Sequence, residues 1–522
     1  MVSNLLESLD TWAEIQITRQ DVEFLHNYLF EHETPLTARE LAFVLIHERN
    51  RAERAAVRKQ QEGSGKVYFP KDSYQTGEAL VFPALAWKHG KVAEVRPGVN
   101  PEIGGFDVLA IDFDDGSRRM FASNLQIHSL NDKPVTVENE GFEPDAIMQE
   151  HGHEIERKLE AAFNDDDQLI RIAGRWFPRA LLVDVNEGNL NLAEAVLDVS
   201  AGEPLPASAL LKDIALPEGV NPKLAEFSLN LALQEDGRFD EVGPAGEVLW
   251  FLKRLEPEEV RNVPAFLQYH PVEHDRALLD KQMLDLEAQL DDELSDLEGK
   301  PDSHLKEVSI ALIYPHLRAG TLPVSARVRS FFPTAYESSR VRFALVDGKT
   351  RQRIPAWVMR EQRYVFGLGD WYKSNGLIPG SLVRIRRGDT PGEVVIEART
   401  YRATKDWMRT AIVGADGGIV FAMLKQAVSA EFNDRMAFAI PSFDAVDQLW
   451  KEGSKRSFEK LVADLTRELS KLTPQGHVHA QELYSAVNIV RRTPPAPLLA
   501  LLASKPEFAH VGDLHFRMSE GE

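Results

Sequence analysis

The chain has 522 residues, more than one hydrophobic core requires, and this length predicts about three to five domains. Its 81 Asp and Glu outnumber 60 Lys and Arg, and the net charge of −21 argues against a protein that coats nucleic acid over its whole surface. The absence of cysteine excludes disulfides, thiolate zinc sites and a cysteine nucleophile.

The first residues, MVSNLLESLDTWAEI, lack the basic and apolar segments of a signal peptide. No stretch approaches the roughly twenty apolar residues that cross a bilayer, so we expect a cytoplasmic protein without a membrane partner. Residues 1–62 are predicted to be an N-terminal helical segment. Within it, Thr37-Ala-Arg-Glu40 has the spacing of a capping box, and apolar residues follow with a helical period.

Residues 66–130 are predicted to form a small antiparallel β-barrel, because short apolar runs alternate with glycine-containing turns. Asp115-Gly116 is the clearest hairpin turn. The order YQTGEALVFP, HGKVAEVRPG and GFDVLAIDFDDG resembles the small Tudor, KOW and CarD-like barrels. That resemblance implies a surface for RNA polymerase, other proteins or nucleic acid rather than a catalytic centre, while a barrel of no particular family stays an alternative.

Two predicted domains, residues 150–256 and 413–522, share a plan of three short helices followed by a two-stranded hairpin. The helices are expected at Leu190 to Val199, Ala207 to Ala215 and Pro222 to Gln234, and at Phe458 to Leu472, Ala480 to Val490 and Ala496 to Ala503. The hairpins begin with Arg238-Phe-Asp-Glu-Val-Gly243 and Glu507-Phe-Ala-His-Val-Gly512. A shorter copy, Leu169-Ile-Arg-Ile-Ala-Gly174 then Trp176-Phe177, follows a predicted helix at 154–163. Such a repeated pattern indicates internal duplication.

These repeats resemble the HARE-type helix-turn-helix, a winged-helix family of transcription, chromatin and restriction proteins. The resemblance implies winged-helix domains. However, the segments at the place of the recognition helix, Pro222 to Gln234 and Ala496 to Ala503, contain almost no Arg or Lys. A recognition helix normally presents Arg, Lys, Asn or Gln to base edges. The predicted winged helices therefore either bind proteins or contact DNA.

Residues 257–305 are predicted to form an acidic helical arm and a linker. Between Asp275 and Glu298, apolar residues recur every three or four positions, which permits a helical hairpin arm or a short coiled coil. At about three heptads, this helix is expected to pack against its own protein.

Residues Pro315 to Thr410 form a basic island, with fifteen Arg and three Lys against eight Asp or Glu. The surrounding domain, 310–412, is predicted to be an Arg-rich β pseudobarrel, with strands at Val324 to Val328, Val341 to Val346, Tyr364 to Leu368, Leu382 to Arg387 and Glu393 to Glu397. In the fourth strand, alternation places Arg384 and Arg386 on one face and Val383 and Ile385 on the other.

The order Tyr364-Val-Phe-Gly-Leu, Trp371-Tyr-Lys-Ser-Asn, Leu377-Ile-Pro-Gly380 and Leu382-Val-Arg-Ile resembles the pseudobarrel DNA-binding domain of plant auxin-response factors and of some restriction-enzyme effector domains. The resemblance implies the fold more than the activity. Arg-rich surface supplies the sequence-independent part of nucleic-acid affinity. The predicted nucleic-acid-binding residues are Arg351, Arg353, Arg363, Trp371, Lys373, Arg384, Arg386 and Arg387. The alternative is that these arginines pair with the acidic remainder of the chain.

Signs of catalysis are weak, and we expect no catalytic residue, metal or cofactor. The histidine pairs at 151 and 153, 270 and 274, and 477 and 479 lack further converging ligands. Asp112 and Asp114 are explained by the adjoining turn, and no phosphate-binding Gly-Lys-Ser/Thr loop occurs.

The sequence thus predicts an α+β multi-domain protein with winged-helix domains and two small β-barrels. The leading hypothesis is a DNA-binding or transcription-associated protein in which the Arg-rich barrel contacts DNA. The alternative is an adaptor that scaffolds RNA polymerase or a defence complex without binding nucleic acid. A metal-dependent hydrolase is a third and weaker hypothesis.

Overall fold

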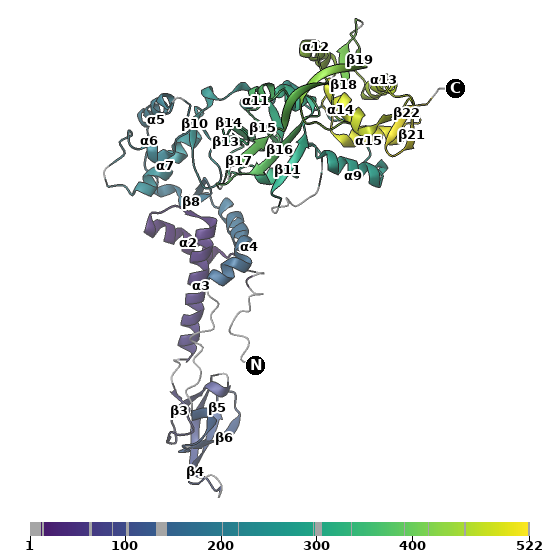
Figure 1. Ribbon diagram of the computed structural model, residues 1–522. Helices are drawn as coiled ribbons and strands as arrows, with labels where there is room; N and C mark the ends of the chain where they lie inside the picture. Colours follow the sequence, from purple (N-terminus) through teal and green to yellow (C-terminus); the bar gives the residue numbers. More distant parts are fainter. Residues whose placement is uncertain are drawn as a thin grey trace. The chain divides into compact units, whose positions relative to one another are not determined.

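A computed structural model describes residues 12, 15–61, 65–85, 87–100, 104–131, 144–200, 202–217, 219–295, 297, 305–335, 337–390, 392–415, 417–453 and 456–519. Over these residues the protein is a mixed α and β structure with several sheets, one of them a half-barrel (Figure 1). Its internal contacts define two compact units, Met1–Val183 with Gly219–Phe227, and Asp184–Glu218 with Ser228–Glu522.

The first unit combines a helical group with a small sheet. Its elements are α2 (Arg19–His32), β1 (Leu36–Thr37), α3 (Ala38–Gln61), β2 (Lys66–Val67), β3 (Ala79–Phe82), η1 (Pro83–Leu85), β4 (Lys88–Pro97), β5 (Asp107–Phe113), β6 (Arg118–Ser123), η2 (Ser129–Asn131), α4 (Pro144–Asn164), β7 (Leu169–Ile172), β8 (Arg175–Pro178), η3 (Arg179–Leu181) and the first part of α7 (Pro222–Glu235).

Helix α3 begins at the predicted capping box. The backbone N of Thr37 donates to Glu40 Oε2 at 2.7 Å, and the backbone N of Glu40 donates to Thr37 Oγ1 at 3.2 Å. Leu41 and Leu45 on α3 pack against Ile155 on α4 in one buried cluster. Helices α3 and α4 therefore share one hydrophobic core, although strands β2 to β6 lie between them in the sequence.

The small sheet has the strand order β2-β3-β4-β5-β6 and an aromatic core that includes Tyr68, Phe82 and Phe113. Strands β5 and β6 form the predicted hairpin, with Gly116 at φ +78° in its turn. A left-handed conformation of this kind favours glycine, so the Asp-Gly signal located the turn correctly.

The second unit contains the half-barrel and two further helical groups. Its elements are α5 (Glu187–Val199), α6 (Ala207–Leu210), the rest of α7, β9 (Phe239–Glu241), β10 (Trp250–Leu252), η4 (Lys253–Leu255), α8 (Glu258–Arg261), η5 (Ala265–Leu267), η6 (Arg276–Leu278), α9 (Lys281–Leu290), β11 (Glu307–Ala311), α10 (Tyr314–Ala319), β12 (Thr321–Pro323), η7 (Arg329–Phe331), β13 (Arg340–Asp347), β14 (Arg353–Met359), β15 (Tyr364–Phe366), α11 (Gly369–Ser374), β16 (Leu382–Arg387), β17 (Val394–Glu397), β18 (Thr400–Val413), β19 (Ile419–Ala430), α12 (Phe443–Gly453), α13 (Phe458–Ser470), β20 (Val478–His479), α14 (Ala480–Val490), α15 (Pro495–Ser504), β21 (Phe508–Gly512) and β22 (His515–Met518).

One arrangement of elements recurs along the chain. The elements α2, β1, α3, α4, β7 and β8 follow the same order as α13, β20, α14, α15, β21 and β22, and the strand orders β1-β8-β7 and β20-β22-β21 correspond. A third group, α5 to β10, has a bridge between Leu205 and Trp250 in place of the short strand. Region 150–256 is thus not one group: α4, β7 and β8 complete the first, while α5 to β10 form the next.

The half-barrel has the strand order β11-β16-β17-β13-β14-β15-β12, in which only β13 and β17 pair in parallel. The predicted strands at β13, β15, β16 and β17 are confirmed within one or two residues. The strand predicted at 324–328 is wrong, because the strand ends at Pro323 and the chain then turns into η7. The predicted boundary at 412 falls inside the paired ribbon of β18 and β19.

The predicted acidic helix is shorter than expected, since α9 covers only Lys281–Leu290. Asp280 caps its start, and Asp291 ends it with φ +49°. Met283 and Leu286 join the core of the C-terminal helical group and pack with Leu498 of α15. The expected packing against its own protein is confirmed, whereas Glu298, the predicted end, lies outside the described residues.

Candidate functional site

Strand β16 has one buried and one cationic face, as its alternation predicts. Val383 and Ile385 are fully buried in the half-barrel core. Arg384 and Arg386 extend from the opposite face and are half-buried. The physical reason is the two-residue period of a strand, which allows the apolar pair to fill the core only if the arginines point outward.

Glutamates flank these two arginines without pairing with them. Arg384 stands opposite Glu397 on β17, and Arg386 stands opposite Glu307 on β11. Within the described part of the chain, neither guanidinium comes within the 4.0 Å of a carboxylate oxygen that defines an ion pair. The nearby glutamates therefore reduce the positive potential at these arginines, but no direct ion pair neutralises either guanidinium.

Other arginines of the basic island do pair with the acidic remainder. Arg318 Nη2 lies 2.6 Å from Asp447 Oδ2, and Arg340 Nη1 lies 2.8 Å from Glu256 Oε2. Arg409 Nη1 donates to Glu482 Oε1 at 3.0 Å. For this group the alternative interpretation of the island is correct, because these arginines connect α10, β13 and β18 to acidic residues of neighbouring segments.

Four of the predicted surface residues are exposed but differ in their contacts. Arg351, in the β13–β14 turn, lies 3.6 Å from Asp389, and Lys373 on α11 lies 3.3 Å from Asp370. Arg353 begins β14.

Arg387 has two contacts at the edge of the half-barrel. Its Nη2 donates to the carbonyl oxygen of Ser330 at 2.9 Å, and its guanidinium lies 5.2 Å from the centre of the Phe331 ring.

Trp371 was predicted at the nucleic-acid surface, but it lies in the half-barrel core. Its side chain is 7% exposed, and Nε1 donates to Asp347 Oδ2 at 2.7 Å. A buried indole needs a partner for its N–H, and Asp347 provides it. This tryptophan therefore has a structural role, and its aromatic face is not available for base stacking.

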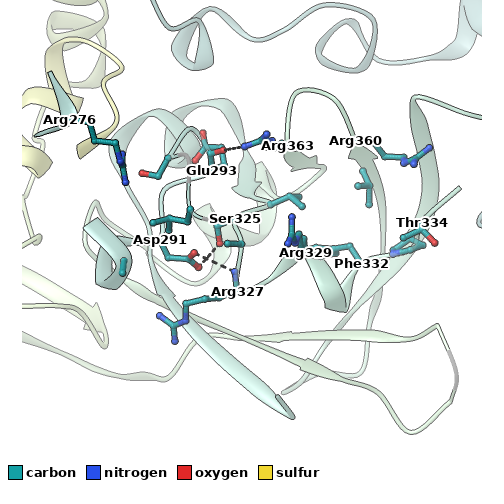
Figure 2. A pocket seen from close by; sticks show the side chains of 17 residues that line it. Arg276, Asp291, Glu293, Ser325, Arg327, Arg329, Phe332, Thr334, Arg360 and Arg363 are labelled. Atoms are coloured by element: carbon teal, nitrogen blue, oxygen red, sulfur yellow. Dashed lines mark hydrogen bonds between the residues drawn. The ribbon is translucent and has the colours of Figure 1, made fainter. Parts of the chain in front are cut away.

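Arg363 was also predicted as a surface residue, and it lies at a cavity of about 1090 Å³ (Figure 2). Three parts of the second unit form the cavity wall: residues from 276 to 295 with Leu297, residues 324–334, and the segment from the end of β14 to the start of β15. Arg363 Nη1 donates to the carbonyl oxygen of Glu293 at 3.0 Å. The sequence prediction missed the other arginines of the wall, Arg276, Arg327, Arg329 and Arg360.

The sequence contains a weak indication of two of the arginines that line the cavity. Arg327 and Arg329 alternate around Val328, which is fully buried, so outward arginines were foreseeable there. Arg276 and Arg360 stand in unrelated segments. Only the tertiary fold brings them to the same cavity.

Two carboxylates also line the cavity, and both are already engaged. Asp291 accepts hydrogen bonds from the Ser325 hydroxyl and from the backbone N of Arg327. Burial raises the pKa of the Asp291 carboxyl. Burial opposes ionisation of Glu293, yet the adjacent Arg492 and His316 hold the pKa of its carboxyl below its usual range.

No cluster of three His, Asp or Glu side chains suited to a metal ion occurs among the described residues. In the same part of the chain, no helix has the length and apolar character needed to cross a membrane. Comparison with known proteins found no matching family model, no matching curated protein and no matching solved structure.

Proposed function

We propose that this chain is a DNA-binding protein without catalytic activity, in which the outer face of β16 contacts the phosphate backbone. The observation that carries the proposal is the pair Arg384 and Arg386, which extends outward from a fully buried strand face and forms no ion pair within the described residues. Unpaired arginines on a rigid strand retain their charge for phosphate oxygens.

The strand register places a third arginine on the same side of the sheet. Arg386 stands opposite Val395, Val395 opposite Val346, and Val346 opposite Arg353, and the two valines between the arginines are buried. Three strand spacings place the backbones of Arg386 and Arg353 about 14 Å apart. We therefore infer contacts to more than one phosphate group of a duplex, from Arg384 and Arg386 at one place and from Arg353 at another.

Winged-helix architecture is our interpretation of the recurring helical groups, on the basis of their shared element order and strand order. We assign them to protein contacts rather than to base recognition. The residues of α15 from Pro495 to Ala500 are buried, and α9 packs against this helix. A helix covered in this way cannot enter a major groove.

The test is fluorescence anisotropy of the full chain with a labelled duplex of about 30 base pairs, over about 50 to 200 mM salt. The double variant Arg384→Ala, Arg386→Ala should weaken binding and reduce the slope of log K against log salt by about two. The control Arg467→Ala, Arg517→Ala removes the same charge from exposed positions of the C-terminal group. No binding at about 50 mM salt, or an equal loss in both variants, would overturn the proposal.

A second candidate function, an adaptor for proteins such as RNA polymerase, is favoured by the β18–β19 ribbon. Trp407 is 65% exposed, and Val420 and Met423 are 40% exposed. Exposed aromatic and apolar side chains on a two-stranded ribbon are typical of protein interfaces. Capture of partners from nuclease-treated extract by the full chain, together with their loss in Trp407→Ser, would support this function.

A further inference from the structure

The arginine-lined cavity offers a second site, separate from the outer face of β16. No residue of β16 lines it. We propose that the cavity binds a phosphate-bearing ligand of nucleotide size, which is either a free nucleotide or the phosphorylated end of a DNA strand. This proposal does not depend on duplex binding by β16.

The size of the cavity fits such a ligand. Its volume of about 1090 Å³ is at the upper end of the range of about 300–1000 Å³ that small-molecule sites occupy. The wall combines apolar side chains, such as Phe332 and Val358, with arginines. Apolar surface next to guanidinium groups is suited to a ligand with a flat base at one end and phosphate at the other.

The charge at the wall favours an anion. Arg276 is held by Glu287, with Nη2 2.7 Å from Oε2, and therefore adds little. Arg327, Arg329, Arg360 and Arg363 come from two sides of the cavity. Figure 2 shows Arg363 beside Glu293, and Arg329 between Ser325 and Phe332.

The wall carboxylates form no ion pair with Arg360 or Arg363 in the described part of the chain. Glu293 Oε1 lies 2.7 Å from Arg492 Nη2 and 3.1 Å from His316 Nε2. Its carboxylate therefore interacts with these buried side chains rather than with the cavity arginines. Asp291 is occupied by Ser325 and by the backbone N of Arg327. Arg327 interacts with Asp291, whereas Arg360 and Arg363 donate to the carbonyl oxygens of Ser338 and Glu293 and so keep their charge for a ligand anion.

A buried hydroxyl is the independent sign of a missing ligand. Ser295 lines the cavity and is 7% exposed, yet its Oγ has no hydrogen-bond partner among the residues that the structure describes. Buried polar groups are nearly always hydrogen-bonded, so an unpartnered hydroxyl at a cavity wall calls for a bound polar group. A phosphate oxygen would accept from Ser295 Oγ and from the neighbouring guanidinium groups together.

The variants are chosen to remove charge without disturbing the fold. Arg363 has φ +57°, a conformation that Asn tolerates well, so Arg363→Asn is combined with Arg329→Gln. Ser295→Ala is a second, separate variant, because its hydroxyl forms no hydrogen bond within the described part of the chain. The matched control is Arg467→Gln, Arg517→Gln, which removes two arginines from the C-terminal helical group.

Two probes are titrated into the full chain: ATP by calorimetry, and a DNA hairpin with a 5′-phosphate or a 5′-hydroxyl by anisotropy. We expect the double cavity variant to bind at least about tenfold more weakly, Ser295→Ala a few-fold more weakly, and the control as the wild type. ATP binding with this loss identifies a free nucleotide. Preference for the 5′-phosphate with this loss identifies a strand end.

The absence of both ATP binding and a 5′-phosphate preference would overturn the proposal, as would binding that the cavity variants leave unchanged. The β16 variant Arg384→Ala, Arg386→Ala separates the two sites. It should weaken duplex binding and leave the cavity ligand in place, so failure of one proposal is distinguishable from failure of the other.

Discussion

Arg492 Nη2 lies 2.7 Å from Asp292 Oδ1, and both side chains are fully buried although 200 positions separate them in the sequence. The same nitrogen lies 2.7 Å from Glu293 Oε1, and Tyr484 donates its hydroxyl to Asp292. The acidic segment after α9 is thereby fixed to the end of α14. Because Asp291 and Glu293 line the arginine cavity, this contact also positions one side of it.

Replacement of Arg492 by Met should strongly destabilise the second unit. Asp292 would lose its buried counter-charge and Glu293 would be left with His316, and breaking a buried ion pair typically costs about 3–5 kcal/mol. Urea denaturation of the full chain measures the free energy of unfolding. Arg467→Met, at an exposed helix position, is the matched control, and a change below about 1 kcal/mol for Arg492→Met would contradict this role.

Trp371→Phe should destabilise the protein without changing its affinity for DNA. The substitution removes the N–H that satisfies Asp347, and the cost of a lost buried hydrogen bond is about 1–3 kcal/mol. Denaturation and duplex titration measure the two effects separately. A loss of DNA affinity with unchanged stability would instead indicate that Trp371 contacts DNA.

Gly380→Ala should be among the most disruptive small substitutions. Gly380 has φ +92°, and an added Cβ would lie 2.5 Å from Ala437 Cα. Backbone strain and a clash with backbone atoms together predict a loss of about 2–4 kcal/mol in the free energy of unfolding. Gly237→Ala is the control, since an added Cβ there meets no atom within 4 Å. Equal stability of the two variants would show that the backbone at Gly380 can move away from Ala437 and accommodate the added Cβ.

Stability should fall as the pH is lowered from 6.5 to about 4, with His479 as one contributor. Burial, together with nearby Arg435 and His515, lowers the pKa of His479 from 6.5 to about 4, while Asp513 acts in the opposite direction. In this window the unfolded ring binds a proton that the folded ring does not. The loss attributable to this group approaches about 1.4 kcal/mol per pH unit.

His479→Asn provides the comparison for this pH effect. The backbone N of Gln481 donates to His479 Nδ1 at 3.1 Å at the start of α14, and Asn is an equally good helix cap that does not titrate. The variant should therefore lose less stability than the wild type between pH 6.5 and 4. Parallel pH profiles would assign the acid sensitivity to other groups.

Local patterns in the sequence anticipated much of the secondary structure. Three of the predicted features each depend on a few consecutive residues. They are the alternation of Val383 and Ile385 with Arg384 and Arg386, the capping box at Thr37 and the turn at Gly116. Their periods and turn preferences act before any tertiary contact forms. The same local logic failed for the strand at 324–328, where the chain turns into η7 instead of continuing the sheet.

What the sequence determined, then, was the alternation of buried and charged faces and the repeated order of helices and hairpins. The tertiary structure decided which charges remain available. It paired Arg318 with Asp447 and Arg340 with Glu256, buried Trp371, and gathered arginines from distant segments around one cavity. The physical reason is that ion pairing and burial depend on distances between residues far apart in the chain, which no local period encodes.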